Sequence, residues 1–334
     1  MAEKVKEAPR ESPMLPNRPK SFGRMRNMKN KQMLGNLLLI LTAMIWGMAF
    51  AFQRKGMESI EPVTFTAVRM GLAAFVVGMT AFLFRRGEDL AALSEEDKAN
   101  YKRNTVVGGI CCGAFLASAS IFQQIGIVYT TAGKAGFITA MYMLLVPIIS
   151  FIFFKKKNSW LVWLAVLIGV CGMYLLCMTE GFRLTRGDTL VCVCAFLFSG
   201  HILCCDHFAS RGDPLKISAI QFLTCSLISG IAALFMEKPE WNQISAAAIP
   251  ILYCGIMSGG VGYTLQMTAQ KFTDPTIASL LMSLESVFAV IGGAILLHEH
   301  MTTRELLGCL IMFAAIILVQ LPASGNNDAQ EYKP

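Results

Sequence analysis

One carboxylate stands out in this sequence because it lies inside a stretch that is otherwise apolar enough to cross a lipid bilayer. The stretch runs from Pro275 to Leu297, and Glu285 is its only charged residue. Roughly 20 apolar residues span the hydrocarbon at a rise of about 1.5 Å per residue. An acid near the middle costs about 2.5–3.5 kcal/mol on insertion scales, so it must face protein or water. We expect Glu285 to face the interior of a helix bundle.

Three roles for Glu285 are compatible with this position. The carboxylate could bind a proton or a cationic group of a transported substrate, as intramembrane acids of transporters do. It could instead pair permanently with a basic residue, or accept hydrogen bonds from exposed backbone at a break in its helix. The sequence leaves all three roles open.

Other polar side chains in apolar segments could line a cavity. Tyr263 and Gln266 lie three residues apart, and therefore on one helix face. Thr139 and Tyr142 lie one turn apart in an earlier segment, and Gln124 follows Gln123 near the end of another. Amides and hydroxyls can hydrogen-bond the polar parts of a small metabolite. The alternative is that they join helices to one another by hydrogen bonds.

Four further residues have both a functional and a structural interpretation. Arg69 is the other intramembrane charge, and we expect it to extend toward the outer headgroups in a structural role. Lys134 begins an apolar segment and could attract an anion to the helix start or only position that helix. Trp46 either shapes the floor of a cavity or packs. His201 is expected to pack or hydrogen-bond, with proton relay as the alternative.

Enzyme and metal chemistry have little support. The chain has no G-x-x-x-x-G-K-[ST] phosphate loop, no G-x-S-x-G nucleophile elbow and no paired catalytic carboxylates. His298, Glu299 and His300 spread around a helix at 100° per residue, so a solvated helix end is favoured over a metal site. The 11 cysteines fall in apolar segments, which favours membrane-embedded thiols over disulfides. We expect no enzyme activity, no cofactor and no bound metal.

Composition sets the class of protein. The mean hydropathy is +0.54, and charged residues make up 15% of the chain, compared with about 25% in soluble domains. The net charge of +7 arises from Lys and Arg in the N-terminal tail and in one set of loops, which indicates membrane topology rather than a nucleic-acid partner. The partners that we expect are the lipid bilayer and a small-molecule substrate.

Ten apolar segments recur along the chain. Lone apolar runs of this length predict helices, since a membrane barrel would show shorter segments that alternate in polarity. The expected spans are 37–53, 62–84, 105–127, 132–154, 159–178, 188–206, 214–236, 245–268, 275–297 and 303–322.

The distribution of Lys and Arg predicts the orientation. Residues 1–35 are expected to form a basic, disordered cytoplasmic tail, and residues 323–334 a polar one. Basic residues favour the cytoplasmic side for both termini. The first apolar run starts too late for a secretory signal peptide. We expect a multi-pass protein of the plasma (inner) membrane, as a monomer or homodimer.

An internal repeat relates the two halves of the chain. Residues 43–69 and 195–221 align without gaps and pair Pro62 with Pro214. A second register pairs Gln124 with Gln266, and a third pairs Pro147 with Ser286. Five spans in each half is an odd number, so the second copy must cross the membrane in the opposite sense. The predicted fold is an all-α integral membrane bundle of ten transmembrane helices in two inverted five-helix repeats, at 36–178 and 188–322.

These residues carry a resemblance to a known family. The sequence resembles the drug/metabolite transporter superfamily of the EamA type at Trp46-Gly47, Pro62, Phe65, Arg69, the run SLLMSLES that contains Glu285, and His298-Glu299. It departs from the family pattern at Ser286, where proline is usual, and at His298, where glycine is usual. The usual acid-proline pair suggests that the acid stabilises a kink.

The resemblance implies a fold and a function. The first, third and fourth spans of each half would line a central cavity. The protein would export or exchange small organic metabolites, amino acids among them, commonly with coupling to an ion gradient, but a shared fold does not name the substrate. Glu285 makes the proton a candidate for the coupling ion. The alternatives are a lipid-modifying enzyme, which needs clustered His and Asp, or a non-transporting scaffold or sensor. The internal loops are too short to hold a sensor domain.

Overall fold

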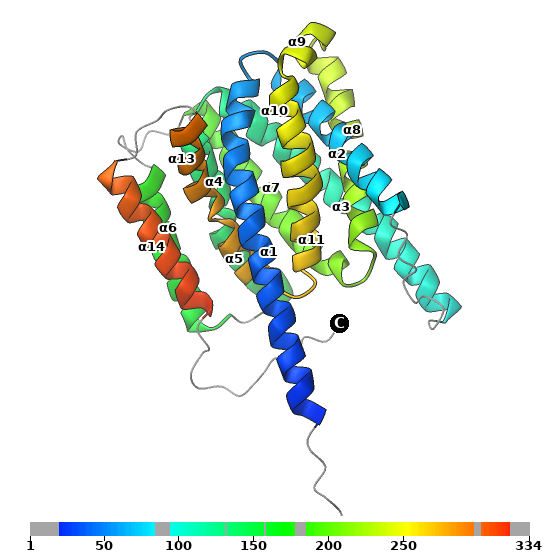
Figure 1. The fold of residues 1–334 in the computed structure, drawn as a ribbon, viewed down its shortest axis with the longest axis vertical. Helices are drawn as coiled ribbons and strands as arrows, with labels where there is room; N and C mark the ends of the chain where they lie inside the picture. The colour runs from blue at the N-terminus through cyan, green and yellow to red at the C-terminus, as the bar shows by residue number, and fades with distance from the viewer. Residues whose placement is uncertain are drawn as a thin grey trace, which may run out of the picture.

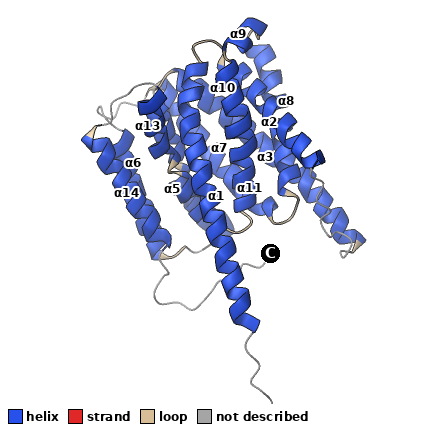
Figure 2. Cartoon of the chain, viewed as in Figure 1, coloured by secondary structure: helices blue, strands red, loops and turns tan. Residues whose placement is uncertain are grey.

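The computed structural model describes residues 20–83, 94–130, 132–156, 158–177, 185–296 and 302–320. Every regular element in these ranges is a helix (Figures 1 and 2). The elements of the first half are α1 (Lys20–Gly56), α2 (Pro62–Leu83), α3 (Glu95–Val128), α4 (Ala132–Ala140), α5 (Tyr142–Phe154) and α6 (Trp160–Cys177). Those of the second half are α7 (Arg186–Ala209), α8 (Pro214–Met236), α9 (Trp241–Ala246), α10 (Ala248–Leu252), the π-helix η2 (Tyr253–Tyr263), α11 (Thr264–Ala269), α12 (Pro275–Met282), α13 (Glu285–Leu296) and α14 (Thr303–Gln320).

The helices confirm the predicted membrane fold. Within the described residues, 8 helices are long and apolar enough to cross a membrane, and two shorter apolar helices lie in α6 and α14. Many large apolar side chains point outward, and Leu234 and Phe235 are 74% and 88% exposed. An apolar outer surface of this kind fits a lipid environment, because the hydrocarbon accepts such side chains without cost.

Two helices are longer than predicted at one end. α1 begins at Lys20, so residues 20–35 of the predicted disordered tail are helical instead. This part is rich in Lys, Arg and Met, which favour helix and allow the first span to continue as a helix into the tail. α3 begins at Glu95, ten residues before the predicted span, because Ser94 caps it by accepting a hydrogen bond from the Asp97 backbone N–H at 3.1 Å.

The contacts between helices have a two-fold pattern. In the repeat, α1 corresponds to α7, α2 to α8, α3 to η2 with α11, α4 and α5 to α12 and α13, and α6 to α14. α1 packs on α13, and in the same way α7 packs on α4 and α5. α3 packs on α7 and on α8, while η2 packs on α1 and on α2. Each contact therefore has its exchanged counterpart, as a two-fold repeat requires.

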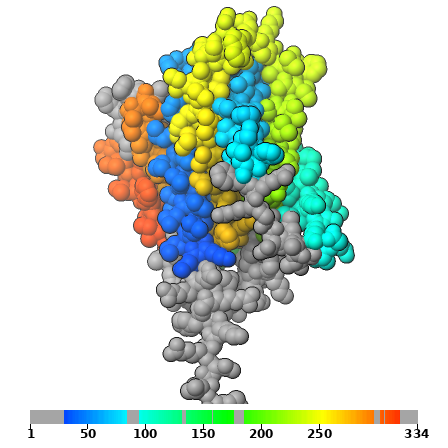
Figure 3. All heavy atoms as spheres, turned by 45° about the vertical axis from the view of Figure 1, so that its right-hand side comes forward, coloured from blue at the N-terminus to red at the C-terminus, as the bar shows by residue number. Residues whose placement is uncertain are grey.

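The two halves are interleaved rather than side by side. Figure 3 shows α1, in blue, flanked by helices of the second half in yellow and orange. Figure 1 shows that α1 starts at the end of the bundle where α14 finishes. Pro62 and Pro214, paired by the repeat, are the first residues of α2 and α8. Proline suits this position because its missing N–H needs no partner in the first turn.

The fourth span of each half is broken near its middle. α4 ends at Ala140 and α5 starts at Tyr142, while α12 ends at Met282 and α13 starts at Glu285. Tyr142 and Glu285 are each the first helical residue after the break, so they occupy equivalent positions when the two halves are aligned at their breaks. The sequence register that pairs Pro147 with Ser286 instead places Val146 opposite Glu285. The structure thus differs from that register by about one helical turn.

The third span of the second half contains the 11-residue π-helix η2. Its glycines allow α1 to come close: a Cβ on Gly262 would lie 2.6 Å from Trp46 Nε1. Side chains also bridge the two helices, since Trp46 Nε1 donates to the Ser258 carbonyl at 3.1 Å and Tyr253 Oη to the Ile45 carbonyl at 3.2 Å. π-helical segments are rare and occur frequently at functional sites.

Candidate functional site

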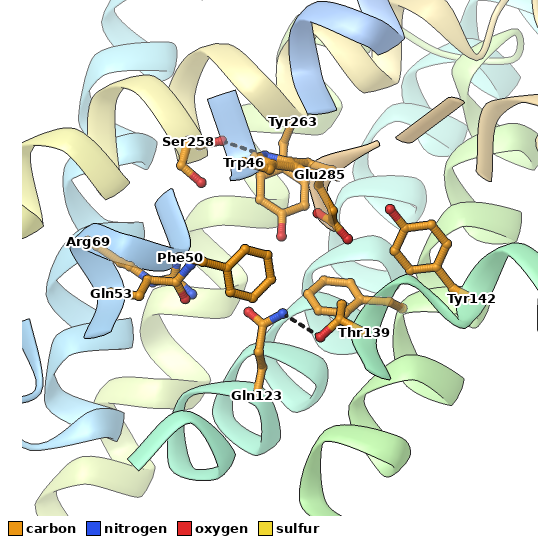
Figure 4. A pocket seen from close by; sticks show the side chains of 11 residues that line it. Trp46, Phe50, Gln53, Arg69, Gln123, Thr139, Tyr142, Ser258, Tyr263 and Glu285 are labelled. Carbon is orange, nitrogen blue, oxygen red and sulfur yellow. Dashed lines mark hydrogen bonds between the residues drawn. The ribbon is translucent and has the colours of Figure 1, made fainter. Parts of the chain in front are cut away.

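A pocket lies between the two halves, near the breaks in the fourth spans (Figure 4). Its cavity volume is about 30 Å³. The lining side chains come from the first, third and fourth spans of each half, with one from α2. They are Trp46, Phe50, Gln53, Arg69, Gln123, Thr139, Tyr142, Phe198, Ser258, Tyr263 and Glu285.

Two opposite charges line this pocket. Arg69 is 2% exposed and Glu285 is 3% exposed, so both are held inside the protein. No hydrogen-bond partner lies within reach of Arg69 Nε or Glu285 Oε1 among the described residues. Arg69 stacks its guanidinium 5.6 Å from the centre of the Phe65 ring. Buried charges are costly unless they are paired, so Arg69 Nε and Glu285 Oε1 are candidate contacts for a further polar group in this pocket.

Aromatic rings form much of the pocket wall. The rings of Trp46 and Tyr263 lie 4.5 Å apart between centroids, at an angle of 50°. The hydrogen bond from Trp46 to the carbonyl of Ser258 fixes the indole. Figure 4 shows the Tyr142 hydroxyl directed toward Glu285, and no hydrogen-bond partner satisfies this hydroxyl in the described structure. The wall can therefore cover an apolar body and still offer hydroxyls to polar groups.

Amide groups complete the polar lining. Gln123 Nε2 donates to Thr139 Oγ1 at 3.1 Å, which joins the third and fourth spans of the first half. Gln53 lies beside Arg69 in Figure 4, on the side of the pocket away from Glu285 and Tyr142. Its Oε1 is buried without a hydrogen-bond partner among the described residues. The Arg69 side of the pocket thus offers a guanidinium Nε and an amide Oε1 that have no hydrogen-bond partner among the described residues.

Comparison with known proteins identifies the family. The sequence profile of the EamA-like transporter family matches residues 33–178 and 185–321, one match for each half. The chain belongs to the EamA-like transporter family. It is therefore a multi-pass membrane transporter, as the resemblance implies.

Individual relatives agree with this assignment. An uncharacterized transporter of Archaeoglobus fulgidus is 30% identical over 293 residues, which cover 87% of each chain. The uncharacterized transporter YoaV of Bacillus subtilis is 22% identical, over 86% of this chain and 96% of its own. A solved crystal structure matches with a TM-score of 0.69 at 16% identity, over 86% of this chain and 96% of that one, and supports the fold.

Several predicted residues lie in the pocket of this EamA-like transporter. Trp46, Thr139, Tyr142, Tyr263 and Glu285 all line it. The pocket thus combines residues that are far apart in the sequence and that come from both repeats. Their roles in binding or coupling remain predictions.

The expected orientation of Arg69 is wrong. A side chain that reached the outer headgroups would be exposed at its tip, whereas Arg69 is 2% exposed and lines the pocket. The Phe65 ring packs against its guanidinium and draws the side chain inward. The sequence did not show which way the Arg69 side chain points.

The structure also bears on the three roles considered for Glu285. No ion pair joins its carboxylate to a basic residue within the described part of the chain, so permanent pairing is not observed. Ser279 and Ser283 serve the carbonyls at the helix break, because their hydroxyls donate to Thr276 and Leu280 at 2.8 Å and 2.7 Å. These hydroxyls satisfy carbonyls, whereas a carboxylate would accept from backbone N–H groups, so the backbone role and the binding of a cationic group or a proton both remain predictions.

Three predicted residues are buried outside the pocket. Gln124 and Gln266, which the repeat pairs, are 0% and 1% exposed, and neither amide has a hydrogen-bond partner in the described residues. His201 lies behind the wall: its Nε2 is 3.0 Å from Gln221 Oε1, and its ring packs edge-on against Tyr263 at 5.7 Å. These residues support the wall rather than line it.

Two predicted sites lie beyond what the structure describes. The backbone of Lys134 belongs to α4, but its side chain lies outside the described part. His298, Glu299 and His300 also lie outside the described residues.

Sequence reasoning missed four lining residues and named a fifth, Gln123, only together with Gln124. Phe50 and Gln53 follow Trp46 by four and seven residues, so the helix period could have found them. Phe198 pairs with Trp46 in the repeat register. Gln123 differs from the predicted Gln124 by one position, which is a rotation of 100° on a helix. Ser258 lies in the π-helix, which no pattern in the sequence signalled.

Proposed function

We propose that this transporter is a secondary active exporter or exchanger of small organic metabolites, and that the pocket between its repeats is the substrate site. The observation that carries the proposal is the pair of buried charges on one pocket, Arg69 and Glu285, each with an atom that has no hydrogen-bond partner among the described residues. Inverted-repeat transporters place their substrate sites near mid-membrane at the interface between the repeats. Rocking of one repeat against the other would expose the pocket to each side in turn.

The charges favour a substrate that carries both an anionic and a cationic group, as amino acids do. A guanidinium such as that of Arg69 can grip a carboxylate with two parallel hydrogen bonds. Glu285 can accept hydrogen bonds from an ammonium group on the other side of the pocket. The rings of Trp46, Phe50 and Tyr142 can then cover the apolar part of the substrate.

The size of the pocket indicates that it must widen to admit such a molecule. A cavity of about 30 Å³ would hold about two waters. Widening is possible where the helices are already interrupted, at Met141 and at residues 283–284 beside the pocket. These breaks lie next to Tyr142 and Glu285, so movement of either helix piece would change the pocket directly. This arrangement suits a binding site that opens alternately toward the two sides.

Glu285 would also couple transport to protons. A carboxylate that binds a proton cannot at the same time form an ion pair with the substrate's cationic group. Arrival of substrate would therefore release the proton, and departure of substrate would allow its return. This exchange at one carboxylate makes the protein a proton antiporter. In the plasma membrane, with both termini cytoplasmic, an inward proton gradient would drive export.

The test is flux in proteoliposomes with a labelled mixture of amino acids and other small metabolites, with and without a pH gradient. The native chain should show gradient-driven flux, and Glu285→Gln should lose it, because a neutral amide cannot exchange a proton. Glu58→Gln is the matched control, since Glu58 is an exposed carboxylate in a local ion pair with Lys55. Gradient-driven flux that persists in Glu285→Gln would overturn the coupling role.

A further inference from the structure

Three charged side chains meet at the end of the bundle where α7 finishes and α12 begins. Lys156 Nζ lies 3.5 Å from Asp206 Oδ2 and 3.7 Å from Asp274 Oδ2. Lys156 follows α5 and belongs to the first repeat, while both aspartates belong to the second. The other ion pairs between described residues each join residues three apart in the sequence. Within the described chain, this cluster is the ionic link between the repeats.

The charges are attached to helix ends whose positions are well defined. Lys155 adopts a left-handed conformation with φ of 52°, and the backbone N–H of Lys156 donates to the Ser150 carbonyl at 3.2 Å, which closes α5. Asp274 caps α12, because its Oδ1 accepts from the backbone N–H of Thr276 at 2.9 Å. Any displacement of α5 from α12 or α7 therefore changes the distances within the cluster.

The helices that the cluster joins also border the pocket. α5 starts at Tyr142, which lines the pocket, and ends just before the cluster. α12 starts just after the cluster and ends at Met282, beside Glu285. α5 and α12 pack against each other along this length. Separation of these two pieces would open the pocket toward this end of the bundle.

The equivalent position at the other end does not join the repeats in this way. Arg54 pairs with Asp206 in the repeat register. Its guanidinium donates to the carbonyls of Ile127 and Val128 at 3.1 Å and 3.4 Å, and these belong to its own repeat. The position equivalent to Asp206 thus carries a charge whose recorded contacts stay within its own repeat, and Glu237 of the second half links the repeats instead by accepting hydrogen bonds from Val63 and Thr64.

We propose that Lys156, Asp206 and Asp274 form an ionic latch that holds α5 against α7 and α12 and closes the pocket to this end of the bundle. Transport requires the latch to open once in each cycle. The side chains of Lys156 and Asp274 are 41% and 38% exposed, so water competes with the ion pairs and keeps them breakable. The 15% exposure of Asp206 shields its pair with Lys156 from part of this competition.

Hydrogen–deuterium exchange of the purified full-length protein in lipid nanodiscs tests the latch without a substrate. Lys156→Met should raise amide exchange in α5 and α12 by about five- to tenfold, because partly exposed pairs contribute modestly to a local closing equilibrium. Lys156→Arg keeps the charge and should preserve protection. Lys216→Met is the matched control, because Lys216 forms a local ion pair with Asp213 at the start of α8.

A double-mutant cycle separates the latch from general destabilisation. Removal of both acids, in Asp206→Asn with Asp274→Asn, should raise exchange as Lys156→Met does, and the triple variant should add little. Unchanged exchange in Lys156→Met, or an equal rise in Lys216→Met, would overturn the proposal. Helix content by circular dichroism should match the native value in each variant. Failure to detect transport would bear on the proposed function but would leave this test intact.

Discussion

The two halves of this transporter share a fold but differ in chemistry. Arg69 of α2 pairs in the repeat with Gln221 of α8, and Tyr142 of α5 is equivalent to Glu285 of α13. The first half thus supplies the cation of the pocket, and the second half supplies the acid. Helix positions are set by packing, which a two-fold repeat satisfies in both halves at once. The polar residues are free to diverge, and their divergence creates the charge separation across the pocket.

The partners of the paired residues show the same divergence. Gln221 lies behind the wall, with its Oε1 3.0 Å from His201 Nε2, whereas its counterpart Arg69 lines the pocket with an unpartnered Nε. The first half is therefore the half whose second span contributes to the site. Substitutions that make one half resemble the other should show which differences serve transport and which serve packing.

The largest effect is expected from Arg69→Gln, which gives the first half the residue of the second. Loss of a charge-assisted, two-bond contact to a substrate carboxylate costs about 1.5–3 kcal/mol, so transport efficiency should fall roughly 10- to 100-fold. Initial rates of labelled substrate flux in proteoliposomes measure the loss. Arg69→Lys retains the charge but not the planar guanidinium that can form two parallel hydrogen bonds, and it should recover only part of the rate. Native rates in Arg69→Gln would exclude Arg69 from substrate binding.

A packing difference between the halves predicts a loss of stability. Gly47 pairs with Ser199 in the repeat, and a Cβ on Gly47 would lie 2.3 Å from Phe288 Cβ and 2.6 Å from the Glu285 carbonyl oxygen. The hydroxyl of Ser199, in contrast, is accommodated and donates to the Ala195 carbonyl at 2.8 Å. Gly47→Ser should destabilise the protein by about 1–3 kcal/mol, because it forces α13 away from α1.

The reciprocal substitution provides the control for Gly47→Ser. Ser199→Gly should cost about 1 kcal/mol or less, the usual penalty for glycine within a helix. Thermal unfolding of the detergent-solubilised protein, followed by intrinsic fluorescence, measures both changes. Equal losses in the two variants would contradict the close approach of α1 to α13.

Two adjacent glutamines of α3, Gln123 and Gln124, allow the pocket to be distinguished from the surrounding core. Gln123 lines the pocket and donates to Thr139, so Gln123→Met should lower transport by about fivefold through the lost hydrogen bond. Gln124 is fully buried beside it without hydrogen-bond partners among the described residues. Gln124→Met should be neutral or stabilising, because it removes an unsatisfied buried amide. Flux and thermal unfolding should be measured in parallel for the two variants. A larger loss of transport in Gln124→Met than in Gln123→Met would contradict the assignment of the pocket to the Gln123 face of α3.

The fold was largely predictable because its signals lie along the chain. Apolar runs mark the spans, and the repeat of residues 43–69 in 195–221 predicts the two-fold arrangement. The π-helix was not predicted; its Gly262 lies against Trp46, which is far away in the sequence. The breaks at Met141 and before Glu285 were not predicted either. No local composition rule marks them.

The residue types of the site were predictable, but the directions in which the side chains point were not all predictable. Intramembrane charge identified Arg69 and Glu285, and both line the pocket. Gln123 and Gln124 were both named from the sequence, and of the two only Gln123 lines the pocket. Gln266 follows the π-helix, so its face depends on a geometry that an α-helical period does not describe. The direction of the Arg69 side chain depends on how α2 packs against α8 and η2, which one sequence does not reveal.

The smallest effect is expected at His201, for which the sequence left proton relay open. Its ring is 1% exposed, contacts Gln221, and packs against Tyr263 from behind the wall. A relay must reach Glu285 through hydrogen bonds or water, whereas Tyr263 separates His201 from the pocket. His201→Asn keeps a polar group toward Gln221 and should change gradient-driven flux by less than about threefold, since it disturbs packing alone. Its dependence on the pH gradient should remain native, and a loss of that dependence comparable to Glu285→Gln would make His201 part of the proton path.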